Sequence, residues 1–399
     1  MKKSDVIVVG GGLAGSHTTF HLSRLGLKVI LLERGSIACG ASGRNGGQVL
    51  QCEGKDRDKD IILNRLKYTK RSVRLLKELK DELDFDYEFK QVGTADIVTD
   101  EEGLAESKEL YELSHSIGDD EIEFLDWKGL HEVCPYFADF LIGGRIRTTD
   151  GNLNPLNLAN GLVDKAKKYG AEVYTWHNVD KVVIESGKVK GVEANGEKFS
   201  ADKVVLATSL WTRDLLPGFG FRIFPHRPLV SLSEPIPYFK PPAFEVLIGD
   251  DVVWGGTQTA TGHLLVGGGA GKPRTVEEQY DYVLDWEDTI RNGRALAMIF
   301  TKIKAVNVLR IWCGVSAYTI DGLPLVGESA MAEGLYIMGG FVAGVCWTPI
   351  CGKLLAELIA NKTPEVDLES MNPNRFDNMK IELPEKYNYA IMLEHLGRL

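Results

Sequence analysis

The chain has 399 residues, of which 44% are hydrophobic and 26% charged, and its 46 basic and 56 acidic residues give a net charge of −10 at neutral pH. This ordinary globular composition excludes a disordered chain, a collagen-like repeat and a small disulfide-stabilised scaffold. The negative charge gives no general attraction to nucleic acid or anionic lipid. The length exceeds what one core usually supports, so we expect two packed domains.

Cysteine usage and the apolar segments give no sign of export, metal binding or membrane insertion. The six cysteines are scattered without a CxxC pair, and the eight histidines form no metal-binding spacing. The apolar run Val6–Val9 is too short for a signal peptide. The segment Leu335–Ala360 contains several glycines, Pro349 and Lys353, so strand, turn and helix explain it better than a membrane span. We expect a cytoplasmic protein with reduced thiols, no metal site and no transmembrane segment.

The first elements in the chain have the pattern of a dinucleotide-binding unit. A continuous apolar strand at Asp5–Val9 is followed by glycines in the spacing GxGxxG and then by helical periodicity. Gly10 permits the tight turn, Gly12 lets the backbone approach a pyrophosphate, and Gly15 lets the helix pack close to the strand. The free N–H groups and the positive dipole end of the helix attract the phosphates.

A second apolar strand, Lys28–Leu32, completes this unit and ends at Glu33. The glutamate is placed to accept hydrogen bonds from ribose hydroxyls. Strand, turn, helix, strand and acid occur in the order that dinucleotide binding requires, which favours a bound dinucleotide over a glycine turn without a ligand. The motif alone leaves FAD and NAD both open.

The next glycine-rich run, Gly40–Gln48, favours FAD. A nicotinamide enzyme would normally continue into another strand and helix, whereas more polar, glycine-rich backbone suits an extended cofactor. Gly46 and Gly47 would allow close approach to a flat ring, and hydrogen-bond donors stand at Ser42, Arg44 and Asn45. From these residues alone, an ordinary glycine loop is an equal alternative.

These motifs resemble those of the D-amino-acid oxidase-like superfamily of flavoproteins, which includes sarcosine oxidase and glycine oxidase. The run Ser42–Gln48 and the later stretch Asn154–Ala159 are similar to those of γ-glutamylputrescine oxidoreductase, and further matching blocks extend from about Ser4 to Ala360. The resemblance implies an α/β, Rossmann-type FAD-binding domain of the GR2-like kind. It also implies an inserted α+β substrate domain built on an antiparallel sheet.

Both domains are expected to be discontinuous in sequence. The FAD-binding domain takes residues 1–85, 145–223 and 302–365, the substrate domain takes residues 86–144 and 224–301, and residues 366–399 form a peripheral C-terminal tail. Amphipathic helical patterns cover Ile61–Phe85 and Ile290–Ile303. The resemblance places the family's adenine-contacting hairpin at residues 170–173 and 179–182, with Val179 as the adenine contact.

The last part of the chain is implied to hold the flavin. The turn at residues 339–344 would carry it to the N-terminus of the final helix, whose dipole would stabilise negative charge on the reduced ring. Tight strand–helix packing is the alternative explanation of these glycines. Ser209 stands where the family usually has glycine, and Cys313 is one residue out of register with the family's covalently bound flavin, so we expect noncovalent FAD.

Motifs and resemblance together assign 24 positions to FAD. They are Gly10, Gly12, Leu13, Ala14, Gly15, Glu33, Arg34, Ser42, Gly43, Arg44, Asn45, Gly46, Gly47, Gln48, Val179, Ala207, Thr208, Trp211, Gly314, Gly340, Phe341, Val342, Ala343 and Gly344.

The resemblance implies oxidation of the C–N bond of an amine or amino acid, by hydride transfer from the α-carbon to flavin N5, followed by hydrolysis of the imine. Amino-acid oxidases of the family clamp the substrate carboxylate with an arginine where this chain has Ser316. A buried carboxylate without that partner would lose about 2–5 kcal/mol. An amine or N-substituted amine is therefore favoured, unless Arg44, Arg227 or Arg310 takes the role. Arg44, Ser316 and Tyr318 are the candidates for the substrate cavity.

The electron acceptor is left open between oxygen and an unknown carrier. Sarcosine oxidase-like members carry a lysine near the flavin, and the corresponding strand here, His263–Gly267, has none. A dye-linked dehydrogenase for proline or another amino acid is thus an alternative, and a non-catalytic flavin-binding subunit is another. The expected partner is a small-molecule amine or amino acid and not nucleic acid, and a homo-oligomer or hetero-complex is compatible with the sequence.

Overall fold

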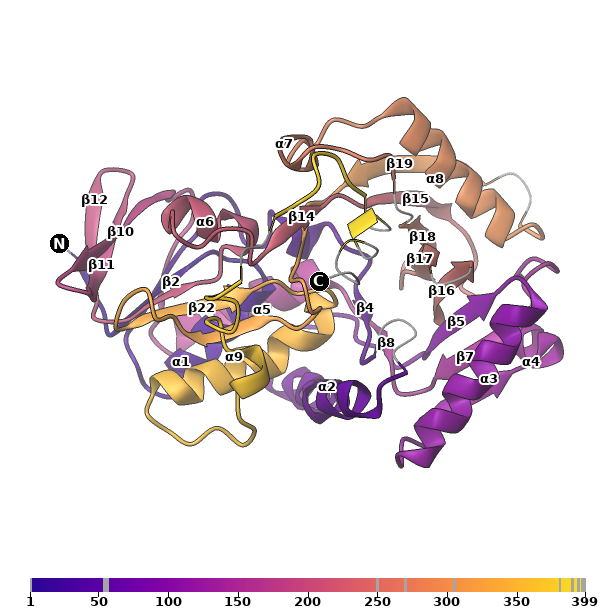
Figure 1. The fold of residues 1–399 in the computed structure, drawn as a ribbon, viewed down its shortest axis with the longest axis horizontal. Helices are drawn as coiled ribbons and strands as arrows, with labels where there is room; N and C mark the ends of the chain where they lie inside the picture. Colours follow the sequence, from indigo (N-terminus) through magenta and orange to yellow (C-terminus); the bar gives the residue numbers. More distant parts are fainter. Residues whose placement is uncertain are drawn as a thin grey trace.

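The computed structural model of the chain describes residues 2–52, 57–248, 251–268, 271–303, 306–379, 382–388, 391, 392 and 395. Two sheets organise the molecule, a mostly parallel one seen on the left of Figure 1 and a larger, mostly antiparallel one on the right. Helix α2 (Lys59–Glu82) runs below and between them in that view. This division matches the expected Rossmann-type domain joined to a substrate domain, so the predicted fold class is confirmed.

The first domain is built on six strands. In sheet order they are β21 (Leu325–Glu328), β22 (Leu335–Gly339), β13 (Val204–Leu206), β2 (Val6–Val9), β3 (Val29–Leu32) and β9 (Glu172–Tyr174). All neighbours are parallel except the edge pair β21 and β22. β2, β3, β13 and β22 are buried along their whole length, because both faces of the sheet are covered. Burial on both faces explains their continuous apolar runs.

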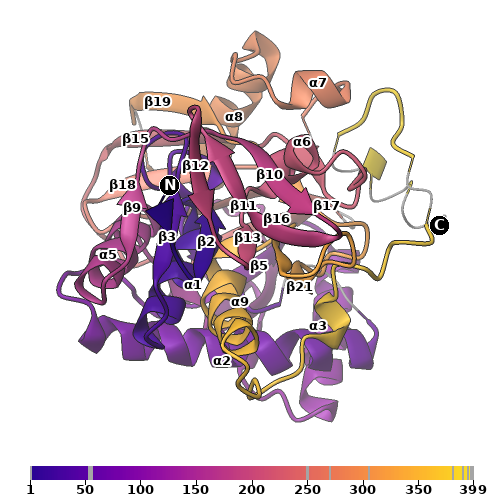
Figure 2. The same cartoon turned by 90° about the vertical axis from the view of Figure 1, so that its left-hand side faces the viewer.

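Helices cover one face of this sheet and a small sheet covers the other. The helices are α1 (Leu13–Arg24), α5 (Pro155–Lys168) and α9 (Gly344–Ile359), with α2 packed against α9. The small sheet consists of β1 (Lys2–Lys3), β12 (Glu197–Ser200), β11 (Lys188–Ala194) and β10 (Val179–Glu185). Figure 2 shows this sheet above the parallel strands and the helices below them. None of the helices in the described part of the chain has the length and apolar character that crossing a membrane requires.

The predicted pairing of residues 170–173 with residues 179–182 is wrong. β9 lies parallel to β3 in the six-stranded sheet, whereas β10 pairs with β11 in the small sheet. α5 is the crossover that brings β9 back parallel to β3, as strand–helix–strand units require. The chain then turns at Trp176, which has a φ of 60°, and enters the other sheet.

The second domain is built on eight strands. In sheet order they are β19 (Val308–Cys313), β15 (Leu229–Pro235), β18 (His263–Gly267), β17 (Asp251–Gln258), β16 (Ala243–Ile248), β5 (Thr94–Val98), β7 (Gly143–Arg147) and β6 (Ile122–Leu125). One pair, β16 with β5, is parallel, because these strands come from the two separate insertions and no tight turn joins them. α4 (Trp127–Val133) and α8 (Trp286–Ile299) cover one face, where alternate side chains such as Ala95, Phe244 and Val266 form an apolar core.

The strands of the eight-stranded sheet indicate where the two domains are divided. β7 and β19 both belong to the eight-stranded sheet, although the sequence assigns residues 145–223 and 302–365 to the FAD domain. Two short pairs join the domains, β4 (Gln48–Val49) with β8 (Gly151–Asn152), and β14 (Phe224–His226) with β20 (Ser316–Tyr318). We propose boundaries beside these pairs, near residues 148 and 314.

The C-terminal tail is more than a surface appendage. Met371 and Tyr387 are 0% and 1% exposed. The Tyr387 hydroxyl donates to the carbonyl oxygen of Pro225 at 2.9 Å, and the Arg375 guanidinium pairs with Asp321. The tail thus contacts both domains. Residues 380, 381, 389, 390, 393, 394 and 396–399 of the tail lie outside the described residues.

Candidate functional site

A cavity of about 600 Å³ is lined by residues of both domains. Val9, Leu32, Ala207 and Gly339 bring the carboxyl ends of β2, β3, β13 and β22 to its wall. This edge of a parallel sheet is where open α/β folds bind their ligands. The residues assigned to FAD that line the cavity are Gly10, Gly12, Leu13, Ala14, Glu33, Arg34, Ser42, Asn45, Gly46, Gln48, Val179, Ala207, Thr208, Trp211, Phe341, Val342, Ala343 and Gly344.

The three glycines of the first motif have different roles at the start of α1. A Cβ on Gly10, which has a φ of 101°, would stand 2.6 Å from the carbonyl oxygen of Ala207. A Cβ on Gly15 would stand 1.8 Å from the carbonyl oxygen of Gly10. The nearest atoms to a Cβ on Gly12 belong only to the Ser42 side chain, the closest at 2.9 Å. Gly10 and Gly15 therefore serve backbone packing, whereas Gly12 leaves space at the cavity wall.

Free backbone donors face the cavity from α1. Gly12 is the N-cap and no side chain caps the helix there. The Leu13 N–H donates to the hydroxyl of Ser42 at 2.9 Å, which joins the helix start to the second glycine run. The remaining first-turn N–H groups and the helix dipole form an anion-binding site of the kind that holds a pyrophosphate.

Glu33 lies at the end of β3 and is 7% exposed. Its carboxylate accepts hydrogen bonds from the N–H groups of Gly11, at 2.6 Å, and Gly35, at 2.8 Å. These bonds fix the carboxylate while leaving it further acceptor positions. It lines the cavity beside the start of α1, as recognition of ribose hydroxyls requires.

The cavity has a flat wall beyond Glu33. The Arg34 guanidinium carbon lies 3.9 Å from the centroid of the Trp211 ring, and both residues line the cavity. Val179 lines the same region together with Asn178 and Asp180. Stacked planar groups beside an apolar residue suit an aromatic base such as adenine.

The second glycine run is folded mainly by its own hydrogen bonds. The Asn45 amide donates to the carbonyl oxygens of Ala41, at 3.1 Å, and Ser42, at 2.9 Å, and its side-chain oxygen accepts from the Gly47 N–H. Gly47 has a φ of 74°, and a Cβ there would stand 2.0 Å from the carbonyl oxygen of Leu153. Asn45 and Gly47 therefore shape the loop more than they offer donors to a ligand.

A second uncapped helix start lies at the cavity. α9 begins at Gly344, directly after the predicted turn, because Gly340 with a φ of 74° turns the chain directly after β22. Its N-cap residue, Ala343, provides no side-chain cap. The α9 dipole can therefore stabilise negative charge on a group in the cavity.

The other assigned residues lie away from the wall of this cavity. They are Gly15, Gly43, Arg44, Gly47, Gly314, Gly340 and Tyr318. A Cβ on Gly43 would stand 2.3 Å from the carbonyl oxygen of Ala38, so this glycine also allows close backbone packing. The Tyr318 ring packs against Phe224 and His226, whereas Ser316 on the same strand lines the cavity.

Arg44 lines a separate cavity of about 300 Å³ with Arg310 and Trp312. The Arg44 Nε donates to the carbonyl oxygen of Cys39 at 3.2 Å, and its guanidinium lies 4.6 Å from the centroid of the Tyr282 ring. Arg227 donates to the carbonyl oxygens of Asp281 and Val283. None of the three arginines that the sequence offers as carboxylate clamps therefore lines the large cavity.

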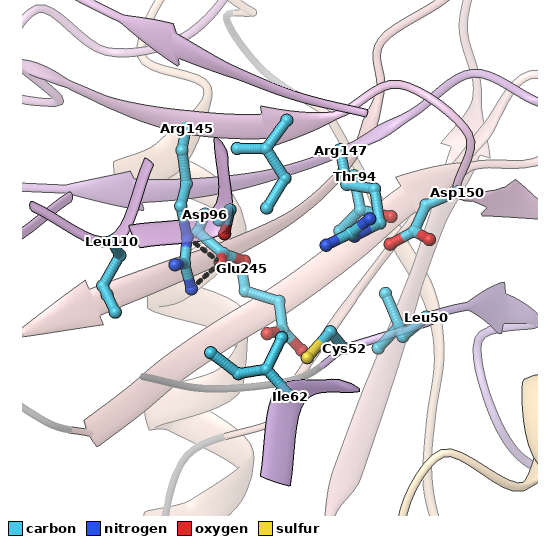
Figure 3. Close-up of a pocket in the computed structure, with 12 residues that line it drawn as sticks. Leu50, Cys52, Ile62, Thr94, Asp96, Leu110, Arg145, Arg147, Asp150 and Glu245 are labelled. Atoms are coloured by element: carbon cyan, nitrogen blue, oxygen red, sulfur yellow. Dashed lines mark hydrogen bonds and ion pairs between the residues drawn. The ribbon is translucent and has the colours of Figure 1, made fainter. Parts of the chain in front are cut away.

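A polar chamber of about 30 Å³ adjoins the large cavity and shares Leu50 and Glu245 with it. Figure 3 shows its arginines among acidic side chains. Arg145 pairs with Asp96 at 2.8 Å. The chamber is large enough for one or two water molecules.

Two further groups give the chamber its polarity. Burial raises the pKa of Asp150 to about 7, although the charge of Arg147 and hydrogen bonds from Gln51 act in the opposite direction. The buried Thr94 hydroxyl has no hydrogen-bond partner among the residues that the structure describes. Water in the chamber would provide that partner.

Part of the wall was not assigned from the sequence, namely Cys39, Leu50, His177, Asn178, Asp180, Ser209, Asp214, Leu215, Glu245, Val315, Ala317, Met338, Val345 and Thr348, together with Val9 and Leu32, whereas Gly40, Ala41 and Gly339 belong to runs that the sequence already connects with the flavin. Asn178 and Asp180 are the sequence neighbours of Val179, the predicted adenine contact, so assigning the neighbours of Val179 as well would have included them. Ser209 was visible as a departure from glycine. Glu245 carried no signal, because only strand register brings it to the cavity.

The residues present fit FAD. Two uncapped helix starts, a fixed carboxylate and a planar wall meet in one cavity that reaches the second domain. These features define a protein that binds a dinucleotide through a Rossmann-type domain.

The chain belongs to the DAO family of FAD dependent oxidoreductases, whose family model matches residues 5–358. It is 25% identical to the glycine oxidase of Geobacillus kaustophilus over 377 residues, covering 93% of this chain and 97% of the relative. It is 27% identical to the γ-glutamylputrescine oxidoreductase of Escherichia coli K12 over 387 residues, covering 91% and 85%. The resemblance drawn from the motifs is confirmed.

Longer relatives and solved structures extend this comparison. The chain spans 44% of the mitochondrial sarcosine dehydrogenase of Homo sapiens, to which it is 25% identical over 422 residues. The crystal structure of L-proline dehydrogenase from P. horikoshii superposes with a TM-score of 0.83 at 26% identity, covering 96% of this chain and all of that one. The chain is therefore an FAD-dependent oxidoreductase.

Proposed function

We propose that this enzyme oxidises the C–N bond of an amine or N-substituted amine, with amino acids as the second substrate class. The observation that carries the proposal is the large cavity, in which the FAD-binding elements meet a wall from the second domain without any of the expected carboxylate-clamping arginines. Bound FAD supplies the acceptor for a hydride from the carbon beside the nitrogen. The resulting imine hydrolyses in water.

The chain's own residues bind and orient the cofactor in this proposal. The α1 start beside Gly12 takes the pyrophosphate, and Glu33 takes the ribose hydroxyls. Arg34 and Trp211 provide a surface for the adenine. The α9 start takes the negative charge that develops at the flavin end.

We propose that the FAD is bound noncovalently. Cys313 is 1% exposed and does not line the cavity. Its Sγ lies 3.9 Å from the carbonyl oxygen of Asp281, and burial raises the pKa of the thiol. A buried, protonated thiol is a poor nucleophile. Denaturation of the purified protein should therefore release all of its flavin into the supernatant.

The preference for amines rests on the cavity's charges. Ser316 lines the cavity where amino-acid oxidases of the family place an arginine, and Arg44, Arg227 and Arg310 are directed elsewhere. The remaining cavity arginine, Arg34, is at the adenine end beside Trp211. A substrate carboxylate would thus lack a bidentate partner.

We propose, second, that the enzyme passes its electrons to an acceptor other than oxygen. Strand register puts Leu265 and Gly267 of β18 on the face opposite the apolar core residues Leu264 and Val266. That face of β18 carries no lysine near the cavity, so it lacks the charge that would stabilise superoxide. Loss of that charge favours a dehydrogenase.

Product analysis tests the reaction class. The enzyme, mixed without oxygen with excess amine and a carbonyl-trapping reagent, should release one carbonyl compound and one ammonia or smaller amine per FAD reduced. Flavin reduction without release of a cleaved nitrogen product would overturn C–N oxidation. A control without substrate measures background reduction.

A further inference from the structure

The strand pair β4 and β8 lies between the two large sheets in the view of Figure 1. Gln48 begins β4 directly after Gly47, whose φ of 74° turns the chain at the end of the second glycine run. Pairing with Asn152 of β8 holds the backbone of Gln48 in place. Its half-buried side chain lines the large cavity, so the turn and the strand pair fix where that side chain enters it.

Hydrogen bonds to the second domain determine which way the Gln48 amide faces. Its Nε2 donates to the carbonyl oxygens of Phe244 on β16 and Gly256 on β17, at 3.4 Å each. With the amide reversed, its oxygen would face two other oxygens, which offer no hydrogen atom to share. The amide nitrogen therefore points to the eight-stranded sheet, and Oε1 is turned away from those carbonyl groups.

Two glycines from different domains lie on either side of the Gln48 Oε1. A Cβ on Gly46 would stand 3.9 Å from Oε1, and beyond its chain neighbours no other atom of the described residues would lie within 4 Å. A Cβ on Gly255 of β17 would stand 3.8 Å from the same oxygen. No donor in the described part of the chain is bonded to Oε1. This oxygen is thus an unused acceptor beside open space in the large cavity.

The charged group nearest to this space already has a partner. Glu245 on β16 also lines the large cavity, and its Cγ would lie 3.8 Å from a Cβ on Gly255. Glu245 interacts with another residue, as do Arg145 and Cys52 beside it. The acceptor that this wall offers to a ligand is therefore the uncharged amide oxygen of Gln48.

We propose that Gln48 Oε1 accepts a hydrogen bond from the N–H of the reacting amine, so that primary and secondary amines are preferred to tertiary amines. When the neighbouring carbon gives up a hydride to the acceptor that FAD supplies, the nitrogen lone pair forms the C=N bond of an iminium ion. The N–H bond stays intact and becomes a stronger donor as the nitrogen gains positive charge. The hydrogen bond to Gln48 is thus strongest as the hydride leaves, which lowers the barrier.

The substitution of the nitrogen decides whether this bond can form. A neutral primary or secondary amine keeps an N–H to donate, whereas a neutral tertiary amine and its iminium ion have none. An uncharged acceptor suits the reacting nitrogen, because a carboxylate in its place would raise the pKa of the amine and retain its proton. This inference rests on the proposed function and names its substrate class.

Two probes that differ by one methyl group on nitrogen test the inference, N-methylbutan-1-amine and N,N-dimethylbutan-1-amine. The second-order rate constant of anaerobic flavin reduction is measured for each amine with the wild-type enzyme and with Gln48→Met, which has a side chain of similar length without an amide. Differences in basicity and size between the two amines are the same for both proteins and cancel in the comparison. The ratio of the secondary-amine to the tertiary-amine rate constant should fall about tenfold in the variant.

Gln91→Met provides the matched control, because Gln91 is an exposed glutamine whose Nε2 donates to a backbone carbonyl oxygen, that of Thr149, away from the wall of the large cavity. It should leave the wild-type ratio unchanged. Equal slowing of both amines by Gln48→Met would overturn the inference, because a lost contact to the flavin or a weakened domain junction acts on both alike. If that variant does not fold, the wild-type order decides, and a tertiary amine that reacts as fast as the secondary amine would overturn the inference.

The inference and the proposed function fail differently. Reduction of the flavin by both probes, with the same ratio in wild type and Gln48→Met, removes only the role of Gln48. Reduction by neither probe, while another amine or an amino acid reduces the flavin, also removes that role alone. Failure of every amine and amino acid to reduce the bound flavin removes the proposed function itself, and the inference with it.

Discussion

Substitution of Gly12 by alanine separates cofactor binding from folding. Gly12 has φ and ψ of −74° and −176°, which alanine adopts readily. The added Cβ would lie 2.9 Å from the Ser42 hydroxyl, at the end of a side chain that can rotate. The fold should therefore survive, while the methyl group occupies the space that the pyrophosphate needs.

The magnitudes follow from the hydrogen bonds affected. Rotation of Ser42 gives up its bond to the Leu13 N–H, which lowers the free energy of unfolding of the apoprotein by about 0.5–1.5 kcal/mol. Displacing the phosphate from one helix N–H removes a charge-assisted bond of about 1.5–3 kcal/mol. The dissociation constant of FAD should therefore rise about ten- to hundredfold.

The assay is a fluorescence titration of apoprotein with FAD, together with urea unfolding of the same preparation. Gly293→Ala is the matched control, because no atom of the described residues lies within 4 Å of a Cβ there and the residue is inside α8. It should stabilise the protein slightly and leave FAD affinity unchanged. Wild-type FAD affinity in Gly12→Ala would refute the assignment of Gly12 to the pyrophosphate. Complete unfolding of the variant would refute the claim that the position tolerates a Cβ.

Three further predictions concern stability. Ser209 has a φ of 54°, so Ser209→Gly should raise the free energy of unfolding by about 0.5–1 kcal/mol. A lower free energy of unfolding for the variant, measured by urea unfolding, would contradict backbone strain at Ser209. Asp119→Asn should lower the free energy of unfolding by about 3 kcal/mol, because it leaves Arg147 buried without its main partner. The exposed control Asp367→Asn should lower it by less than about 1 kcal/mol. Equal reductions in the two variants would count against the importance of the buried pair. Asp150 has a raised pKa of about 7, so its protonated form stabilises the fold at low pH and this stabilisation is lost as pH rises toward 7. The free energy of unfolding of Asp150→Asn, relative to that of the wild type, should thus increase between about pH 4 and pH 7. A difference between the two proteins that does not change with pH would exclude a raised pKa for Asp150.

The dinucleotide-binding unit was predictable because its constraints are local. β2, β3 and the start of α1 follow from a buried apolar strand, a glycine turn and a helix that are contiguous in sequence. Glu33 could be placed for the same reason, since it directly follows β3.

Glycines were harder to interpret than their spacing suggested. Gly43 and Gly47 were assigned to the flavin, but in the structure they avoid clashes with the carbonyl oxygens of Ala38 and Leu153. A sequence shows that a residue lacks a Cβ, and it does not show which neighbour fills the space. Tertiary packing decides between ligand approach and backbone approach.

Glu245 and the pairing of β9 depended on long-range register. Glu245 reaches the cavity because β16 lies beside β5 and β17, and these strands come from distant segments. A shift of one residue would have placed it in the apolar core instead. Nothing in the residues around it specifies that register.

The most direct test of the central claim is an anaerobic absorbance titration of the purified protein with amines and amino acids, followed by admission of air. We expect a flavin spectrum with a band near 450 nm, as the cofactor class requires, and we expect amines to bleach it at lower concentrations than amino acids do. Slow recovery of colour in air would agree with a dehydrogenase and rapid recovery with an oxidase. A purified protein that shows no flavin spectrum and gains none on addition of FAD would contradict the account.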